Sequence, residues 1–201
     1  MSSLMKNYAY AVVTILIALT VAHFLADDSY QWQVNSISQL GAQAYDKAWI
    51  IHFGFIAFGI IVLLTGASRI RMDVKYWFRE TPIMIYGFAI LLSGIFSAEP
   101  FMAGVAYSTQ EAQLHGLFAT VAGFALTTAI LMFTFTDVPN SRRIVHFIAL
   151  VLVTGFSLLF GVLPNVAGIM QRLLWAAGFS WLLYLGFNPI PRDHSNAKSS
   201  A

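Results

Sequence analysis

Long runs of apolar residues, each bounded by charged or turn-forming residues, dominate the chain. Six of these runs approach the roughly 20 residues that a helix needs to cross the hydrocarbon core of a bilayer. They lie at about residues 8–26, 49–66, 81–97, 114–135, 144–163 and 169–187. The pattern predicts an all-α, polytopic membrane protein: one domain over residues 1–187, built as a bundle of six transmembrane helices, with a flexible cytoplasmic tail over residues 188–201.

The composition supports the prediction of a membrane protein and excludes some kinds of functional group. Of the 201 residues, 58% are hydrophobic and 10% are charged, whereas a soluble domain has about 45–50% and 25%. Six spans leave no room for a separate soluble catalytic domain. The chain has no cysteine, so thiolate metal sites and disulfides are excluded. The net charge of +2 follows membrane topology, and we expect no nucleic-acid partner.

Basic residues indicate the orientation of the bundle. Nine of the eleven Lys and Arg residues fall on one side of a six-span arrangement, at positions 6, 69, 71, 75, 79, 142, 143, 192 and 198. Only Lys47 and Arg172 fall on the other side. Because basic residues favour the cytoplasmic side, we expect both termini to be cytoplasmic. Two longer loops, at about 27–48 and 98–113, then lie outside and carry most of the polar chemistry.

Local signals place several helix ends in these outer loops. Ser36 and Gln39 have the spacing of a capping box, and Gly41 is placed to end a very short helix. We therefore expect this segment to form an ordered turn on the outer surface. In the same way, Ser108 is expected to cap the fourth helix and Asp46 the second.

Small residues recur within two of the apolar runs, as Gly87 and Gly94 in the third and Ala119 and Gly123 in the fourth. Small residues allow helix backbones to approach closely in lipid. We expect both pairs to lie at helix contacts in a compact bundle.

Three histidines fall near the outer ends of different runs. Ionisable residues are costly within a membrane span, so their positions are informative. His52 and His115 lie at comparable depths, as a haem bound by two imidazoles would require, and His23 with Glu99 could complete a zinc site instead. His146 lies at the opposite end of its run and cannot join this group.

The outer loops also carry the groups of a serine hydrolase. Ser38 could act as nucleophile, His115 as general base and Glu99 as the carboxylate that orients the base. Arg172 lies about one turn into the sixth run and cannot lose its charge, so it should face a carboxylate, a polar pocket or a lipid phosphate. This set predicts a hydrolase or acyl transferase that acts on a lipid at the outer leaflet.

Four short motifs recur together in one known family. They are Asn-Ser-Ile-Ser-Gln-Leu-Gly at 35–41, Gly-Ile-Phe at 94–96 with Glu99 after it, Leu-His at 114–115, and Gly-Ile-Met-Gln-Arg at 168–172. On these motifs the chain resembles the multi-span membrane proteins of bacteria and archaea catalogued as domain of unknown function 998. The resemblance implies a prokaryotic cytoplasmic membrane and includes Ser38, Glu99, His115 and Arg172 in the family pattern. It brings no activity with it, and members usually carry an acidic residue where Gln39 stands.

Three functions therefore remain open at the sequence level. The chain could recognise, and in the sharper version hydrolyse, a lipid-like or amphiphilic molecule at the outer face, with Arg172, Gln171 and Gln39 as ligand-binding residues. It could instead bind zinc or haem, or act as a non-enzymatic structural or lipid-binding protein. Membrane lipids are the expected partners in each case. The middles of the helices offer chiefly Thr, Ser and Gly, so an ion channel or proton pump is not expected.

Overall fold

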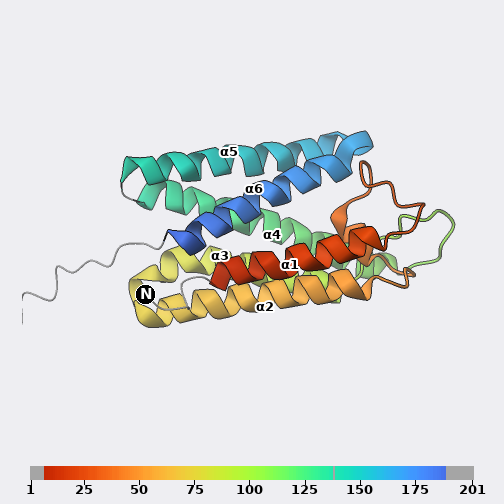
Figure 1. Cartoon of the computed structure of the whole chain (residues 1–201), viewed down its shortest axis with the longest axis horizontal. Helices are drawn as coiled ribbons and strands as arrows, with labels where there is room; N and C mark the ends of the chain where they lie inside the picture. Colours follow the sequence, from red (N-terminus) through yellow and green to blue (C-terminus); the bar gives the residue numbers. More distant parts are fainter. Residues whose placement is uncertain (1–6, 138, 189–201) are drawn as a thin grey trace, which may run out of the picture.

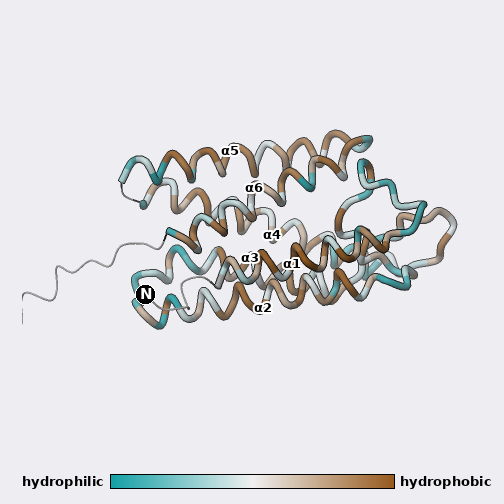
Figure 2. Tube along the Cα trace, viewed as in Figure 1, coloured by the Kyte–Doolittle hydropathy of each residue, from teal (hydrophilic) through white to brown (hydrophobic). Residues whose placement is uncertain are grey.

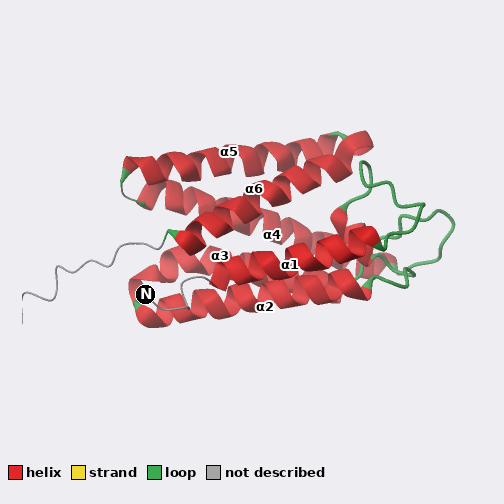
Figure 3. Cartoon of the chain, viewed as in Figure 1, coloured by secondary structure: helices red, strands yellow, loops and turns green. Residues whose placement is uncertain are grey.

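The computed structural model describes residues 7–137 and 139–188, which form helices and loops and contain no β-strand (Figures 1 and 3). The α-helices are α1 (Asn7–Phe24), α2 (Trp49–Met72), α3 (Trp77–Ile95), α4 (Thr109–Thr136), α5 (Asn140–Val162) and α6 (Ala167–Phe187). Short 3-10 helices are η2 (Ile37–Gly41), η3 (Val74–Tyr76) and η4 (Pro164–Val166). The all-α prediction is confirmed for this part of the chain.

Five helical segments are long and apolar enough to cross a membrane: Trp49–Met72, Val74–Ile95, Thr109–Thr136, Asn140–Val162 and Pro164–Phe187. The first apolar run forms a shorter helical stretch, Tyr8–Phe24. Figure 2 shows hydrophobic residues along the helices and hydrophilic residues in the connections at either end. This is the architecture of an integral, multi-pass membrane protein. Apart from Asn188, the predicted tail lies outside the described residues.

Successive helices run in opposite directions, so the bundle has two distinct ends (Figure 1). The start of α1 and the end of α6 lie at one end, here called the terminal end. The segments 25–48 and 96–108 gather at the other end, here called the loop end, which corresponds to the predicted outer face (Figure 3).

Glycines bring α2 and α3 into close contact. A Cβ atom added at Gly59 would lie 2.4 Å from the carbonyl oxygen of Gly87, and one added at Gly94 would lie 2.7 Å from Cβ of Phe55. The predicted packing role of Gly87 and Gly94 is therefore confirmed. Gly123 differs, because a Cβ atom there would have no neighbour within 4 Å.

A buried ionic network joins four helices near the terminal end. Arg69 Nη1 lies 3.1 Å from Glu80 Oε1, and Arg69 Nη2 donates to the carbonyl oxygen of Leu185 at 3.3 Å. The hydroxyl of Tyr8 donates to the second carboxylate oxygen of Glu80. Arg69 is 8% exposed, Glu80 1% and Tyr8 0%. These contacts tie α1, α2, α3 and α6 together.

A second polar network holds the start of α5. The Trp181 indole donates to His146 Nδ1 at 2.9 Å, which leaves the proton of this imidazole on Nε2, 3.0 Å from Asp137 Oδ2. Arg142 and Arg79 lie 3.0 and 3.7 Å from the same carboxylate. The terminal end of α5 is thereby fixed to α4, α6 and α3.

The rest of α5 is much less enclosed. Its buried residues are His146, Ala149 and Val153, and the last of them lies just past the middle of the helix. From residue 154 to 162 the helix has no buried residue. At the loop end α5 is therefore not packed tightly into the bundle, and this arrangement leaves space beside α4.

We expect Arg69→Met to destabilise the protein strongly, because it leaves the Glu80 carboxylate buried without a charge partner. Breaking a buried ion pair in this way costs about 3–5 kcal/mol, which thermal unfolding in detergent would detect. Arg71→Met is the matched control, since Arg71 is exposed on the same helix. Adding Glu80→Gln to Arg69→Met should recover part of the loss, and an equal loss in Arg71→Met would contradict the assignment.

Candidate functional site

A cavity of about 650 Å³ lies among α2, α3, α4, α5 and α6. This volume is in the range of sites that bind small organic molecules, about 300–1,000 Å³. The walls are mainly apolar and include Phe55, Ile90, Leu126, Val153 and Trp175. Among the residues that the structure describes, no Asp, Glu, Lys or Arg lines the cavity.

Two glycines of α4 help to create this space. Gly116 and Gly123 line the cavity, and a Cβ atom added to either would have no neighbour within 4 Å. The expectation that Gly123 mediates close helix packing is therefore wrong. It lies where α4 faces the loosely packed half of α5, so no partner helix fills the space beside it.

The cavity is elongated along α4 and open between α4 and α5. Its lining runs from His115 to Thr127, about 18 Å along a helix axis at 1.5 Å per residue. That length is more than half of a hydrocarbon core about 30 Å thick. Exposed residues of both helices, including Phe124 and Leu158, form part of the lining. The opening therefore faces the surroundings of the bundle, which in a membrane are lipid tails.

His115 forms the polar end of the cavity. Its Nδ1 lies 2.9 Å from the carbonyl oxygens of both Ser93 and Phe96, where α3 ends. Because both partners are acceptors, Nδ1 carries a proton and donates it. No described residue forms a hydrogen bond with Nε2. Ser93 also lines the cavity, and its hydroxyl is buried without a hydrogen-bond partner.

The helix η2 covers the loop end of the cavity. Ser36 N–H donates to Gln39 Oε1 at 2.9 Å, and the short helix ends at Gly41 as expected from the sequence. Ile37 N–H donates to Gln171 Oε1, which ties η2 to α6. Ser38 lines the cavity, and its Oγ lies 3.0 Å from Oγ of Ser36. The hydroxyl of Ser38 forms no hydrogen bond to His115.

Arg172 fixes the loop that precedes η2. Its Nη1 donates to the carbonyl oxygens of Trp32 at 2.8 Å and Asn35 at 3.2 Å, and its Nη2 donates to the Tyr30 hydroxyl at 2.7 Å. Burial raises the pKa of Tyr30, although Arg172 beside it acts in the opposite direction. The protonated phenol in turn donates a hydrogen bond to the carbonyl oxygen of Ser36 at 3.0 Å.

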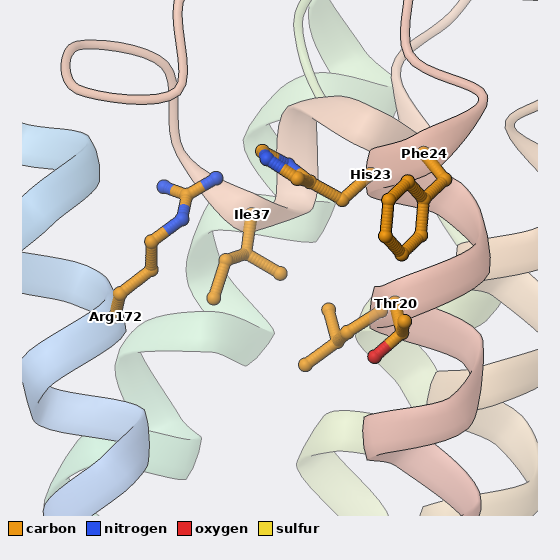
Figure 4. Close-up of a pocket in the computed structure, with 6 residues that line it drawn as sticks. Thr20, His23, Phe24, Ile37 and Arg172 are labelled. Atoms are coloured by element: carbon orange, nitrogen blue, oxygen red, sulfur yellow. The ribbon is translucent and has the colours of Figure 1, made fainter.

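Arg172 also lines a second, smaller pocket of about 260 Å³ between α1 and α6 (Figure 4). His23 and Arg172 extend into this pocket from opposite sides, with Ile37 of η2 between them. Ile37 lines the smaller pocket and Ser38 lines the larger cavity. Thus η2 separates Arg172 from His115, and the predicted outer cluster is divided between two pockets.

Glu99 and His52, two further predicted site residues, form no hydrogen bond to His115. Glu99 is exposed and accepts a hydrogen bond from the Tyr107 hydroxyl at 3.1 Å, which raises the pKa of Tyr107. His52 Nε2 lies 2.9 Å from the carbonyl oxygen of Gly41. We expected the Glu99 carboxylate to orient His115 through a hydrogen bond. In the structure, backbone carbonyl oxygens accept the hydrogen bond of His115 Nδ1 instead.

Three polar residues near the helix ends, Glu111, Ser108 and Asp46, differ in how far the sequence predicted their roles. Glu111 accepts a hydrogen bond from Ser97 N–H at 2.8 Å, and it thus joins the start of α4 to the end of α3, a role that the sequence did not reveal. The predicted cap at Ser108 is confirmed. The prediction for Asp46 is wrong, since α2 begins after Ala48 and has no side-chain cap.

The histidines do not form a metal site in the part of the chain that the structure describes. No group of three or more His, Asp or Glu side chains is placed there to hold an ion. His23 packs edge-on against Tyr30, with ring centroids 6.2 Å apart. The zinc hypothesis built on His23, His52, His115 and Glu99 therefore has no ligand set among these residues.

The helices and the cavity that opens beside them define a multi-pass membrane protein with an internal cavity. Residues 10–188 match the family model described as "Protein of unknown function (DUF998)". The chain belongs to this family, which confirms the resemblance seen in the short motifs. No curated protein and no solved structure matches it.

We expect Gly168→Ala to loosen the contact between α6 and the loop before η2. An added Cβ would lie 2.3 Å from the carbonyl oxygen of Trp32 and 2.5 Å from that of Asn35. Overpacking of this kind costs about 1–3 kcal/mol, which should appear in thermal unfolding and as faster hydrogen exchange in residues 30–41. Gly161→Ala is the control, because its Cβ meets nothing within 4 Å; equal behaviour of the two variants would contradict the close-contact explanation.

Proposed function

We propose that this membrane protein binds an amphiphilic, lipid-like molecule in the cavity between α4 and α5. The observation that carries the proposal is a 650 Å³ space with largely apolar walls and an unused histidine nitrogen at one end. A hydrophobic pocket with a few polar groups that fix orientation is typical of small-molecule binding sites. The opening between α4 and α5 gives a molecule dissolved in the bilayer direct access.

Binding accounts for the arrangement better than hydrolysis does. A serine hydrolase needs its nucleophile bonded to the base and an orienting group behind the base. Ser38 Oγ lies beside Ser36, Glu99 bonds to Tyr107, and Arg172 lies on the other side of η2. Only Ser38 and His115 of the expected catalytic groups share the cavity. We therefore propose recognition of the amphiphile as the function, with no chemical step.

The proposal places the loop end outside and the terminal end in the cytoplasm. The basic residues Arg71, Lys75, Arg79, Arg142 and Arg143 all lie in the connections at the terminal end or in the helix turns next to them. An excess of Lys and Arg in short connections favours the cytoplasmic side. In this orientation the His115 end of the cavity lies toward the outer leaflet.

Single cysteines test this orientation cleanly, because the chain has none of its own. We expect a membrane-impermeant maleimide to label Ala103→Cys, at the loop end, in intact cells. Ser141→Cys, exposed at the start of α5, should react only after the cells are broken. Labelling of Ser141→Cys alone in intact cells would reverse the orientation.

Filling the cavity should abolish binding. We expect 12-bromododecan-1-ol, whose bromine quenches nearby indoles, to quench the cavity residue Trp175 saturably in detergent-solubilised protein. Gly123→Leu should weaken this binding at least about tenfold, because the Leu side chain occupies the ligand space while Leu favours helix over Gly. Gly161→Leu should bind normally, since Gly161 does not line the cavity.

Trp175→Phe identifies the quenched residue and should remove the saturable component. Quenching that is the same in the Gly123→Leu protein as in the unaltered protein would show that the probe binds elsewhere. That result would overturn the proposed function.

A further inference from the structure

We infer that the ligand of this cavity is an uncharged amphiphile with a hydroxyl headgroup, which donates a hydrogen bond to His115 Nε2. The inference rests on the proposed function and specifies the class of molecule. It follows from the hydrogen bonds already made at the polar end of the cavity and from the charges of the lining.

The two carbonyl partners of His115 determine what its free nitrogen does. Nδ1 is 2.9 Å from both Ser93 O and Phe96 O and must donate to them. Among the described residues, His115 forms no ion pair with a carboxylate, and Glu111 accepts from the Ser97 N–H instead. An apolar cavity favours the neutral imidazole. In that form Nε2 is an acceptor only, so its partner must supply a proton.

The lining also selects against a charged headgroup. An ionised group buried without a partner is very costly, and the described part of the chain places neither a cation nor a carboxylate in the lining. Arg172 lies in the other pocket, where three backbone carbonyls and the Tyr30 hydroxyl receive its hydrogen bonds. A phosphate or ionised carboxylate would therefore have no counter-charge at His115.

The free nitrogen of His115 discriminates among uncharged headgroups. A ligand hydroxyl can donate to His115 Nε2. An ether, ester or ketone can only accept, and would leave Nε2 unsatisfied.

The shape of the cavity suits a slender molecule with this headgroup. The hydroxyl lies at the His115 end, and the tail follows α4 toward Thr127, about 18 Å away along the helix. Long-chain alcohols and monoacylglycerols have the required combination of an uncharged hydroxyl and an apolar chain. They are the class of ligand that we propose.

Three probes with the same chain separate headgroup from tail: 12-bromododecan-1-ol, its methyl ether, and 12-bromododecanoate at pH 8. Quenching of Trp175 reports binding of each. We expect the alcohol to bind about tenfold more tightly than the ether, as for one hydrogen bond lost to a buried acceptor. The carboxylate should bind more weakly than the alcohol.

His115→Asn tests the role of the imidazole. Its side-chain amide can still donate to the carbonyls of Ser93 and Phe96, but it has no atom at the position of Nε2. The ratio of alcohol to ether affinity should fall toward one. His23→Asn, an exposed histidine outside this cavity, should leave the ratio unchanged. If His115→Asn does not fold, the comparison of alcohol with ether on the unaltered protein provides the test.

The outcomes distinguish this inference from the proposed function. Equal binding of alcohol and ether, with quenching still lost in Gly123→Leu, would overturn the hydroxyl assignment and leave binding in the cavity intact. Tighter binding of the carboxylate would also overturn the assignment. Failure of all three probes to quench Trp175 saturably would overturn the proposed function itself.

Discussion

The loop end of this bundle depends on a guanidinium group that cannot give up its charge. Arg172 lies in the second turn of α6, at a depth where no carboxylate pairs with it among the described residues. Backbone carbonyls and the Tyr30 hydroxyl provide its hydrogen bonds instead, so the loop before η2 folds around the side chain. The neighbouring Gln171 binds the first turn of η2. These contacts position η2 over the cavity, between the two pockets at this end.

The cavity itself follows from an imbalance between the ends of α5. Asp137, His146 and Trp181 hold its first turns against the bundle through buried hydrogen bonds. Such networks are strong where water is excluded. Toward the loop end the helix has only exposed or half-buried residues, and α4 presents Gly116 and Gly123 to it. Packing of large side chains across this contact would close the space, so the small residues of α4 keep it open.

The sequence predicted the features that arise from neighbouring residues. Apolar runs located the helices, and the spacing of Ser36 and Gln39 indicated the short helix η2, because both signals are local. The Arg69 to Leu185 hydrogen bond joins residues 116 positions apart, and no pattern in the chain indicates it. Gly87 and Gly123 look alike in sequence, yet one touches a neighbouring helix and the other lines a cavity. Which residues line the cavity is therefore determined by tertiary packing, and local sequence patterns do not predict that packing.

The histidines show that a similar predicted depth in the membrane does not make residues members of one site. Three of them lie near the same predicted depth, and a fourth was set aside because it lies at the opposite end. In the structure His146 uses both ring nitrogens, one with Trp181 and one with Asp137. His115 lines the cavity and uses only Nδ1 in hydrogen bonds to described residues. Buried polar groups in proteins are nearly always hydrogen-bonded. A buried imidazole nitrogen without a protein partner, beside an apolar cavity, is therefore a more specific indication of a binding site than any grouping of residue types.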